Sequence, residues 1–292
     1  MEIFWGQIDE SAGYAKLEGQ EAAHCVKVLR HRYGDEINVI DGGGDLYVCK
    51  ICEASPKEVN ALIINTIHNW NAHPYKLVLG VAPTKNADRF EWFVEKAVEL
   101  GVDEIYPLVC ERSERRRLNA ERLQRVALAA VKQSLKAKTP LIGEEISFAD
   151  FLRKRSREPH SEGTGAQGRK GGLRMIAHCM DGKKFSILRA LEDYFEKVKT
   201  WEKPCGCVHT EKPLDKNLLV GEDKNAEACQ AQNKAIPEVT ALIGPEGDFS
   251  PSEAQMAIEN GYVPIHLGPS RLRTETAAVS AVEAVYLLSS RQ

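Results

Sequence analysis

The sequence lacks any long run of apolar residues, and no segment approaches the roughly 18 apolar residues of a membrane-spanning helix. Its opening residues, 1–4, do not begin a signal peptide. Both absences favour a cytoplasmic protein with no membrane partner. The chain also lacks a strong charge of either sign, because its formal net charge over 292 residues is −3. Any binding to nucleic acid must therefore depend on local basic patches.

A clear metal-binding cluster is also missing, although the chain has eight cysteines. Cys49 and Cys52 have the spacing of a zinc or redox pair, but no second pair follows at zinc-finger distance. Cys49 lies on an expected strand that ends at residue 51, and alternation along the chain would project the two thiols to opposite faces. The segment Cys205-Gly206-Cys207-Val208-His209 offers three potential ligands without a clear fourth. We therefore predict no metal site.

Short alternating segments separated by turns occupy the first part of the chain, residues 1–72. Expected strands cover residues 14–17, 36–40 and 47–51. The glycine-rich turn 41–45 joins the last two strands as a hairpin. A short helix is expected at 21–30, where apolar residues recur on one side. This pattern predicts a small β-barrel domain.

Strands and helices alternate in the second part of the chain, residues 73–292, which is typical of a parallel sheet covered by helices. Expected strands cover residues 76–81, 104–109, 174–178, 239–243 and 263–267. Expected helices cover residues 88–100, 119–136 and 275–289. Two polar segments, at about 156–172 and 199–236, have little periodicity and are predicted to be surface insertions.

Two glycine-bearing loops near the C-terminus each follow an apolar strand and each open a helix. The first is Gly244-Pro245-Glu246-Gly247, and the segment Ser250-Pro251-Ser252-Glu253 after it has the residues of a helix cap. The second loop covers residues 268–273. Glycine after a buried strand lets the backbone approach a ligand closely. Because ligands of open α/β sheets bind beyond the carboxyl ends of the strands, the two loops predict a small-molecule site.

These two loops together resemble the RsmE family of SPOUT RNA methyltransferases, whose patterns there read roughly L-I-G-P-E-G-G-F-S and L-G-x-x-I-L-R-T-E-T-A. The matching positions are Leu242 to Gly247, Phe249, Ser250, Leu267, Gly268 and Leu272 to Ala277. Asp248 departs from the pattern, because the family usually has a second glycine there.

Other elements of the chain also resemble that family, among them an Arg-Ser pair at Arg112 and Ser113. The family pattern H-x-x-x-V-L-R is matched by His24, Val28, Leu29 and Arg30. The family pattern E-Q-S-x-R is matched by Gln133 and Ser134, with Lys132 and Lys136 as departures. The change from arginine to Lys136 keeps the charge but loses the bidentate geometry of a guanidinium.

The resemblance implies a SPOUT-type α/β fold, in which a parallel sheet with helices on both faces forms a trefoil knot. It also implies a PUA-like RNA-binding domain at residues 1–72 and a methyltransferase domain at 73–292. The implied activity is S-adenosylmethionine-dependent methylation of uridine N3 in 16S rRNA of the small ribosomal subunit. The implied assembly is a homodimer, and DNA is not an implied partner.

The resemblance further implies which residues hold S-adenosylmethionine. They are His178, Leu242, Ile243, Gly244, Pro245, Glu246, Gly247, Leu267, Gly268, Leu272, Arg273 and Thr274. His178 at the end of its strand also has a simpler interpretation, because a histidine there often only satisfies local hydrogen bonds.

The chemistry of uridine N3 points to two candidate catalytic residues. This nitrogen carries a proton, so the site must stabilise a uracil anion or accept the proton. Arg273 and Glu275 offer a guanidinium and a carboxylate side by side. In the alternative interpretation, both side chains only cap and brace the last helix.

Candidate RNA-binding residues lie in both parts of the chain. They are His24, Arg30, Arg112, Arg115 and Arg116. Two other functions stay open: a SPOUT methyltransferase with another RNA target, and a non-catalytic RNA-binding factor in ribosome assembly. Binding of S-adenosylmethionine distinguishes the second of these from an enzyme.

Overall fold

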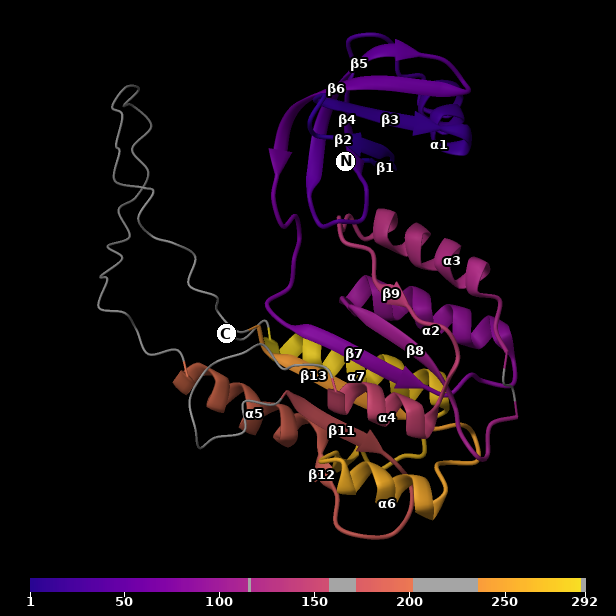
Figure 1. Ribbon diagram of the computed structural model, residues 1–292, viewed down its shortest axis with the longest axis vertical. Helices are drawn as coiled ribbons and strands as arrows, with labels where there is room; N and C mark the ends of the chain where they lie inside the picture. The colour runs from indigo at the N-terminus through magenta and orange to yellow at the C-terminus, as the bar shows by residue number, and fades with distance from the viewer. Residues whose placement is uncertain (115–116, 158–171, 202–235, 290–292) are drawn as a thin grey trace.

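The computed structural model describes residues 1–114, 117–157, 172–201 and 236–289, which form two domains (Figure 1). Most of the two expected insertions lies outside these residues. So do the candidate RNA-binding residues Arg115 and Arg116 and the candidate metal ligands Cys205, Cys207 and His209.

The N-terminal domain is built on a six-stranded sheet with the order β1-β4-β5-β6-β3-β2. Its strands are β1 (Ile3–Trp5), β2 (Gln7–Asp9), β3 (Tyr14–Glu18), β4 (Glu36–Ile40), β5 (Leu46–Ala54) and β6 (Glu58–Ile67). The three expected strands and the hairpin between β4 and β5 are confirmed. Strands β1, β2 and β6 were not predicted from the sequence.

Gly6 connects the two edge strands β1 and β2, so the chain itself joins the two sides of this sheet. A Cβ atom at this position would lie 2.7 Å from Val39 Cγ1 and 2.9 Å from Leu17 Cδ2. Only glycine fits such a close approach without displacing the core. Gly6 thus lets β1 pass directly into β2 against the apolar core of this domain, as expected for a small barrel.

The helix expected at 21–30 is shorter and less regular than predicted. An α-helix, α1 (Gly19–Ala23), passes into one π-helical turn, η1 (His24–Val28). Arg30 has a φ of 63°, in the left-handed region that a regular helix excludes. The helix therefore ends before Arg30, whose exposed side chain projects from a loop.

The second domain contains an eight-stranded sheet with the order β10-β8-β7-β13-β11-β14-β12, and β9 pairs with β8. All of these pairs are parallel. The strands are β7 (Lys76–Val81), β8 (Glu104–Val109), β9 (Leu141–Ile142), β10 (Ile146–Ser147), β11 (Leu173–Ala177), β12 (Phe185–Ser186), β13 (Glu238–Ile243) and β14 (Val263–His266). The predicted parallel sheet is therefore confirmed, and the trefoil threading of the chain stays a prediction.

Helices cover both faces of this sheet (Figure 1). They are α2 (Ala87–Leu100), α3 (Ala120–Gln133), α4 (Phe148–Arg157), α5 (Ile187–Trp201), α6 (Pro251–Glu259) and α7 (Thr274–Ser289). Helices α2, α5 and α7 pack on one face, with α3 against α2, and α4 and α6 pack on the other. Alternate residues of each strand face opposite cores, as Leu77 and Val78 of β7 show.

The two domains are joined by direct polar contacts. Lys132 Nζ at the end of α3 lies 2.6 Å from Glu21 Oε1 of α1. The Leu135 carbonyl accepts hydrogen bonds from Trp70 Nε1 at 2.9 Å and from Asn71 Nδ2 at 2.8 Å. The departure at Lys132 thus has a structural reason, because a glutamate there would face the carboxylate of Glu21.

Candidate active site

A cavity of about 810 Å³ lies beyond the carboxyl ends of β11, β13 and β14. Three segments form its walls, namely 177–184 after β11, 243–248 after β13 and 265–277 around the second glycine loop. The two loops singled out in the sequence therefore meet at one site. They meet because neighbouring parallel strands end at the same edge of the sheet.

The first loop is held in place by the helix that follows the second loop. Thr274 Oγ1 donates a buried hydrogen bond of 3.0 Å to the carbonyl oxygen of Gly244. Lys85 N donates to Glu246 Oε1 at 2.9 Å, which anchors the loop to the segment after β7. Ser250 and Glu253 form the predicted capping box at the start of α6. Contacts within the protein thus fix the conformation of this loop.

Asp248, the departure from the family pattern, connects two walls of the cavity. Its φ of 63° lies in the left-handed region, which explains why glycine is usual at this position. Its Oδ2 accepts a hydrogen bond from Cys179 N at 2.8 Å, and its Oδ1 accepts one from Phe249 N at 2.9 Å. The aspartate therefore keeps the glycine-like backbone and adds a bond to the loop after β11.

His178 contributes a neutral imidazole to the cavity wall. Burial lowers the pKa of His178, the nearby Lys184 ammonium lowers it further, and the Asp248 carboxylate opposes both. Its Nδ1 atom is buried without a hydrogen-bond partner among the described residues. Lys184 Nζ is held at the same place by the carbonyls of His178 at 3.3 Å and Met180 at 2.7 Å.

Arg273 supplies an unpaired cation at the second loop. It lines the cavity and is exposed, and its guanidinium forms no hydrogen bond or ion pair with any described residue. The adjacent Arg271 instead reaches the carbonyl oxygen of Glu246 at 3.4 Å. Gly268 has a φ of 126° and lets the chain turn sharply after β14. The Arg273 side chain is therefore available to a ligand.

Glu275 does not share the cavity with Arg273. It is 7% exposed, is absent from the lining, and its Oε1 lies 3.7 Å from Nη1 of Arg89 on α2. This position in the first turn of α7 braces the helix on which Thr274 is fixed. The geometry thus favours the bracing interpretation for Glu275, and its direct part in proton transfer stays a prediction.

Most of the other predicted cofactor residues line the cavity. They are His178, Ile243, Gly244, Pro245, Glu246, Leu267, Gly268, Leu272 and Thr274. Leu242 instead packs in the core beneath α6, and Gly247 lies against Arg112. Further lining residues were not predicted from the sequence, among them Cys179, Met180, Lys184, Asp248, Ile265 and His266. Cys179, Met180 and Lys184 could have been predicted, because they follow the strand that ends before His178.

The candidate RNA-binding residues differ in their surroundings. Arg30 is exposed, whereas the half-buried His24 ring lies 6.1 Å from the ring of Phe4. Arg112 Nη1 donates to the carbonyls of Gly247 at 3.1 Å and Phe249 at 3.4 Å. Arg112 therefore holds the first glycine loop, in addition to any contact with RNA.

Metal ligands do not gather in the part of the chain that the structure describes, where no group of three or more His, Cys, Asp or Glu residues is suitably placed. Cys49 is buried and Cys52 is partly exposed, as expected for thiols on opposite faces. Among the described helices, none has the length and apolar character needed to cross a bilayer.

Comparisons with known proteins agree with this geometry. A family model for an RNA methyltransferase domain matches residues 71–202 and 198–286, and a model for an RNA methyltransferase PUA domain matches residues 17–64. Ribosomal RNA small subunit methyltransferase E of Bacillus subtilis is 23% identical over 98% of this chain and 94% of its own length. The protein of that name from Aquifex aeolicus is 25% identical over 97% of each chain.

Solved structures are similar over the whole length. A probable rRNA-methyltransferase from Porphyromonas gingivalis has a TM-score of 0.72 and 29% identity, covering 100% of this chain and 99% of its own. A putative methyltransferase from Legionella pneumophila, solved with bound S-adenosylmethionine, has a TM-score of 0.65 and 23% identity, covering 98% and 97%. At 23% identity, the similarity to the Legionella pneumophila structure shows a shared fold only.

Proposed function

This chain belongs to the RNA methyltransferase family, and from that premise we propose that it methylates N3 of a uridine in 16S rRNA with S-adenosylmethionine as donor. The observation that carries the proposal is the cavity in which both glycine loops meet Arg273. The named small-subunit methyltransferases that resemble this chain along almost their whole length support the substrate. A substrate in the small ribosomal subunit favours the cytoplasm as the compartment.

The residues of the cavity fit S-adenosylmethionine. Its volume lies within the roughly 300–1,000 Å³ of ligand pockets. Ile243, Ile265 and Leu267 offer an apolar wall that suits an adenine ring, and the Asp248 carboxylate suits a cationic ligand. His178 stays neutral and adds no charge that would repel the sulfonium. When bound, this cofactor supplies the methyl group.

Residues of the protein then position the uracil and stabilise its negative charge. We assign a stabilising role to Arg273: its guanidinium stabilises the negative charge that develops on the uracil ring when N3 loses its proton. Thr274 and Glu275 hold the start of α7 through Gly244 and Arg89, which fixes the point from which Arg273 extends. Alignment of nucleophile and methyl group supplies much of the remaining rate.

Titration calorimetry with S-adenosylmethionine tests the proposal directly. We expect saturable binding to the full chain, because contacts within the protein hold the loops that line the cavity. A chain that binds small-subunit RNA but gives no heat with the cofactor would instead be a non-catalytic assembly factor.

The proposed working form is a homodimer. Tyr286 and Leu287 near the end of α7 are 41% and 50% exposed. Other large apolar side chains of this domain are also exposed. Such side chains are typical of a surface that is covered on assembly. Sedimentation of the purified chain measures this directly.

A chelator is expected to leave methyl transfer unchanged, because transfer from a sulfonium requires no metal. The measurement is the methylation rate of small-subunit RNA before and after treatment with EDTA. If activity fell and zinc restored it, the segment with Cys205, Cys207 and His209 would become the leading metal site.

Replacing Arg30 by alanine is expected to weaken RNA binding while the affinity for S-adenosylmethionine stays the same. The exposed Arg30 lies on the N-terminal domain, away from the cavity. Loss of one phosphate contact should reduce the slope of log K against log salt by about one. Arg189→Ala, at an exposed arginine of α5, is the matched control. An altered cofactor affinity with normal RNA binding would contradict the assignment.

A further inference from the structure

A second cavity, of about 260 Å³, lies between the two domains at the start of β7. Its lining comes from the hairpin turn at Gly43 and Gly44, the interdomain linker 69–73 and the segment 136–140 after α3. It shares no lining residue with the active-site cavity, which lies beyond the opposite end of the sheet. The proposed methyl transfer gives it no role.

An unusual backbone conformation places Lys136 at this cavity. Leu135 has a φ of 57°, and the linker residues Asn69 and Asn71 have φ values of 52° and 51°. Asparagine tolerates the left-handed region, whereas leucine rarely adopts it, so the conformation of Leu135 persists only where the surrounding structure holds it. The Leu135 carbonyl is held by hydrogen bonds from Trp70 and Asn71. The linker thereby fixes the backbone of Leu135 and with it the position of the next residue, Lys136.

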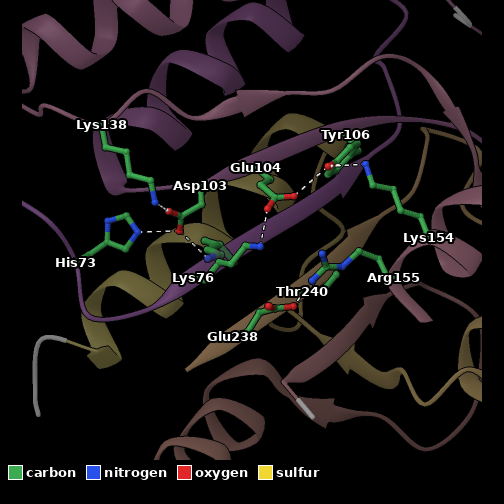
Figure 2. A network of polar contacts seen from close by, with 11 residues as sticks. His73, Lys76, Asp103, Glu104, Tyr106, Lys138, Lys154, Arg155, Glu238 and Thr240 are labelled. Atoms are coloured by element: carbon green, nitrogen blue, oxygen red, sulfur yellow. Dashed lines mark hydrogen bonds and ion pairs between the residues drawn. The ribbon is translucent and has the colours of Figure 1, made fainter. Parts of the chain in front are cut away.

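Lys136 is a partly buried cation without a counter-charge. Burial alone lowers the pKa of its ammonium group, which forms no hydrogen bond or ion pair with any described residue. Asp103 supplies the carboxylate of this cavity, and both of its oxygens already have partners within the protein. Its Oδ1 lies 2.8 Å from Lys138 Nζ and its Oδ2 lies 2.9 Å from His73 Nε2 (Figure 2). Oδ2 also accepts a hydrogen bond from Leu77 N.

The charges around the cavity therefore leave an excess of one positive charge. Asp103 and Lys138 compensate each other, and Lys76 is paired with Glu104 at 2.7 Å. Only Lys136 remains unmatched among the charged residues of the described lining. A desolvated ammonium group of this kind destabilises the empty protein unless an anion joins it.

We propose that this interdomain cavity binds a phosphate group through Lys136. A lysine acts on phosphate as a compact charge, which suits a site that one ammonium group dominates. The phosphate can belong to an RNA backbone that passes between the domains or to a small phosphate ligand. The proposal does not depend on methyl transfer.

The first experiment measures thermal unfolding of the full chain with inorganic phosphate against chloride at equal ionic strength. Lys136→Met keeps the length of the side chain and removes the charge, and Lys57→Met is the control at an exposed lysine. We expect phosphate to stabilise the wild type and the control, with an affinity at least about tenfold weaker in Lys136→Met. Without phosphate, Lys136→Met should be as stable as the wild type or more stable.

A second experiment identifies the source of the phosphate with a 16S rRNA fragment. Weaker RNA binding by Lys136→Met, with a salt slope reduced by about one, assigns the site to the RNA backbone. Unchanged RNA binding with lost stabilisation by phosphate assigns it to a small ligand. The proposal is overturned if phosphate stabilises Lys136→Met as much as the wild type. It is also overturned if this variant is less stable without phosphate, because Lys136 is then a structural residue.

Discussion

Replacing Arg273 by alanine is expected to lower the turnover of methyl transfer by roughly 10²–10³, the typical loss when one charge-stabilising donor is removed. The guanidinium is unpaired in the cavity, so its loss disturbs no other contact of the described protein. Arg273→Lys should recover only part of the rate, since a point charge does not reproduce a planar fork. Single-turnover transfer of a labelled methyl group to small-subunit RNA measures both variants.

Glu275→Gln is the companion variant for this test. Its carboxylate is paired with Arg89 outside the cavity, so we expect lower thermal stability with nearly normal turnover. Lost turnover that rises with pH would instead identify Glu275 as the proton acceptor. Full activity of Arg273→Ala in an intact protein would remove the arginine from the mechanism.

Replacing Glu238 by glutamine is expected to lower the free energy of unfolding by about 3 kcal/mol, the lower end of the range for breaking a buried ion pair. Arg155 on α4 is 2% exposed and is ion-paired with Glu238 at the start of β13, with Thr240 as a further partner (Figure 2). The variant keeps the shape of the side chain and removes the negative charge that is paired with Arg155. Glu238 retains some solvent contact, which places the expected loss at this lower end.

Urea unfolding of the full chain measures this effect. Glu58→Gln is the matched control, because its pair with Lys16 is exposed and should contribute less than about 1 kcal/mol. Equal, small losses in the two variants would contradict a stabilising role for the buried pair.

The elements that could be predicted are those in which local sequence and tertiary packing agree. The strands 76–81 and 104–109 have the predicted bounds, and Ser250 caps α6 as its sequence indicates. Helices α4 and α5 were missed although their apolar residues recur with helical spacing, because both adjoin the polar segments that were assigned as insertions. The helix at 21–30 was predicted too long, because no glycine or proline next to Arg30 indicates its left-handed φ.

The candidate site was predictable where it is made of loops that follow strands. Gly244 and Gly268 could be assigned because the carboxyl ends of parallel strands meet at one edge. Contacts between distant segments could not be foreseen. The bond from Cys179 to Asp248 and the pairing of Glu275 with Arg89 depend on how the strands are ordered, which the sequence pattern leaves open.

The central claim is that this chain methylates uridine N3 in 16S rRNA, and mass mapping of small-subunit rRNA from cells with and without the gene tests it most directly. We predict that one uridine carries a base methyl group in the parent and loses it in the deletion. The wild-type gene should restore the methyl group, and the Arg273→Ala gene should not. Identical methylation of 16S rRNA in the two strains would contradict the claim.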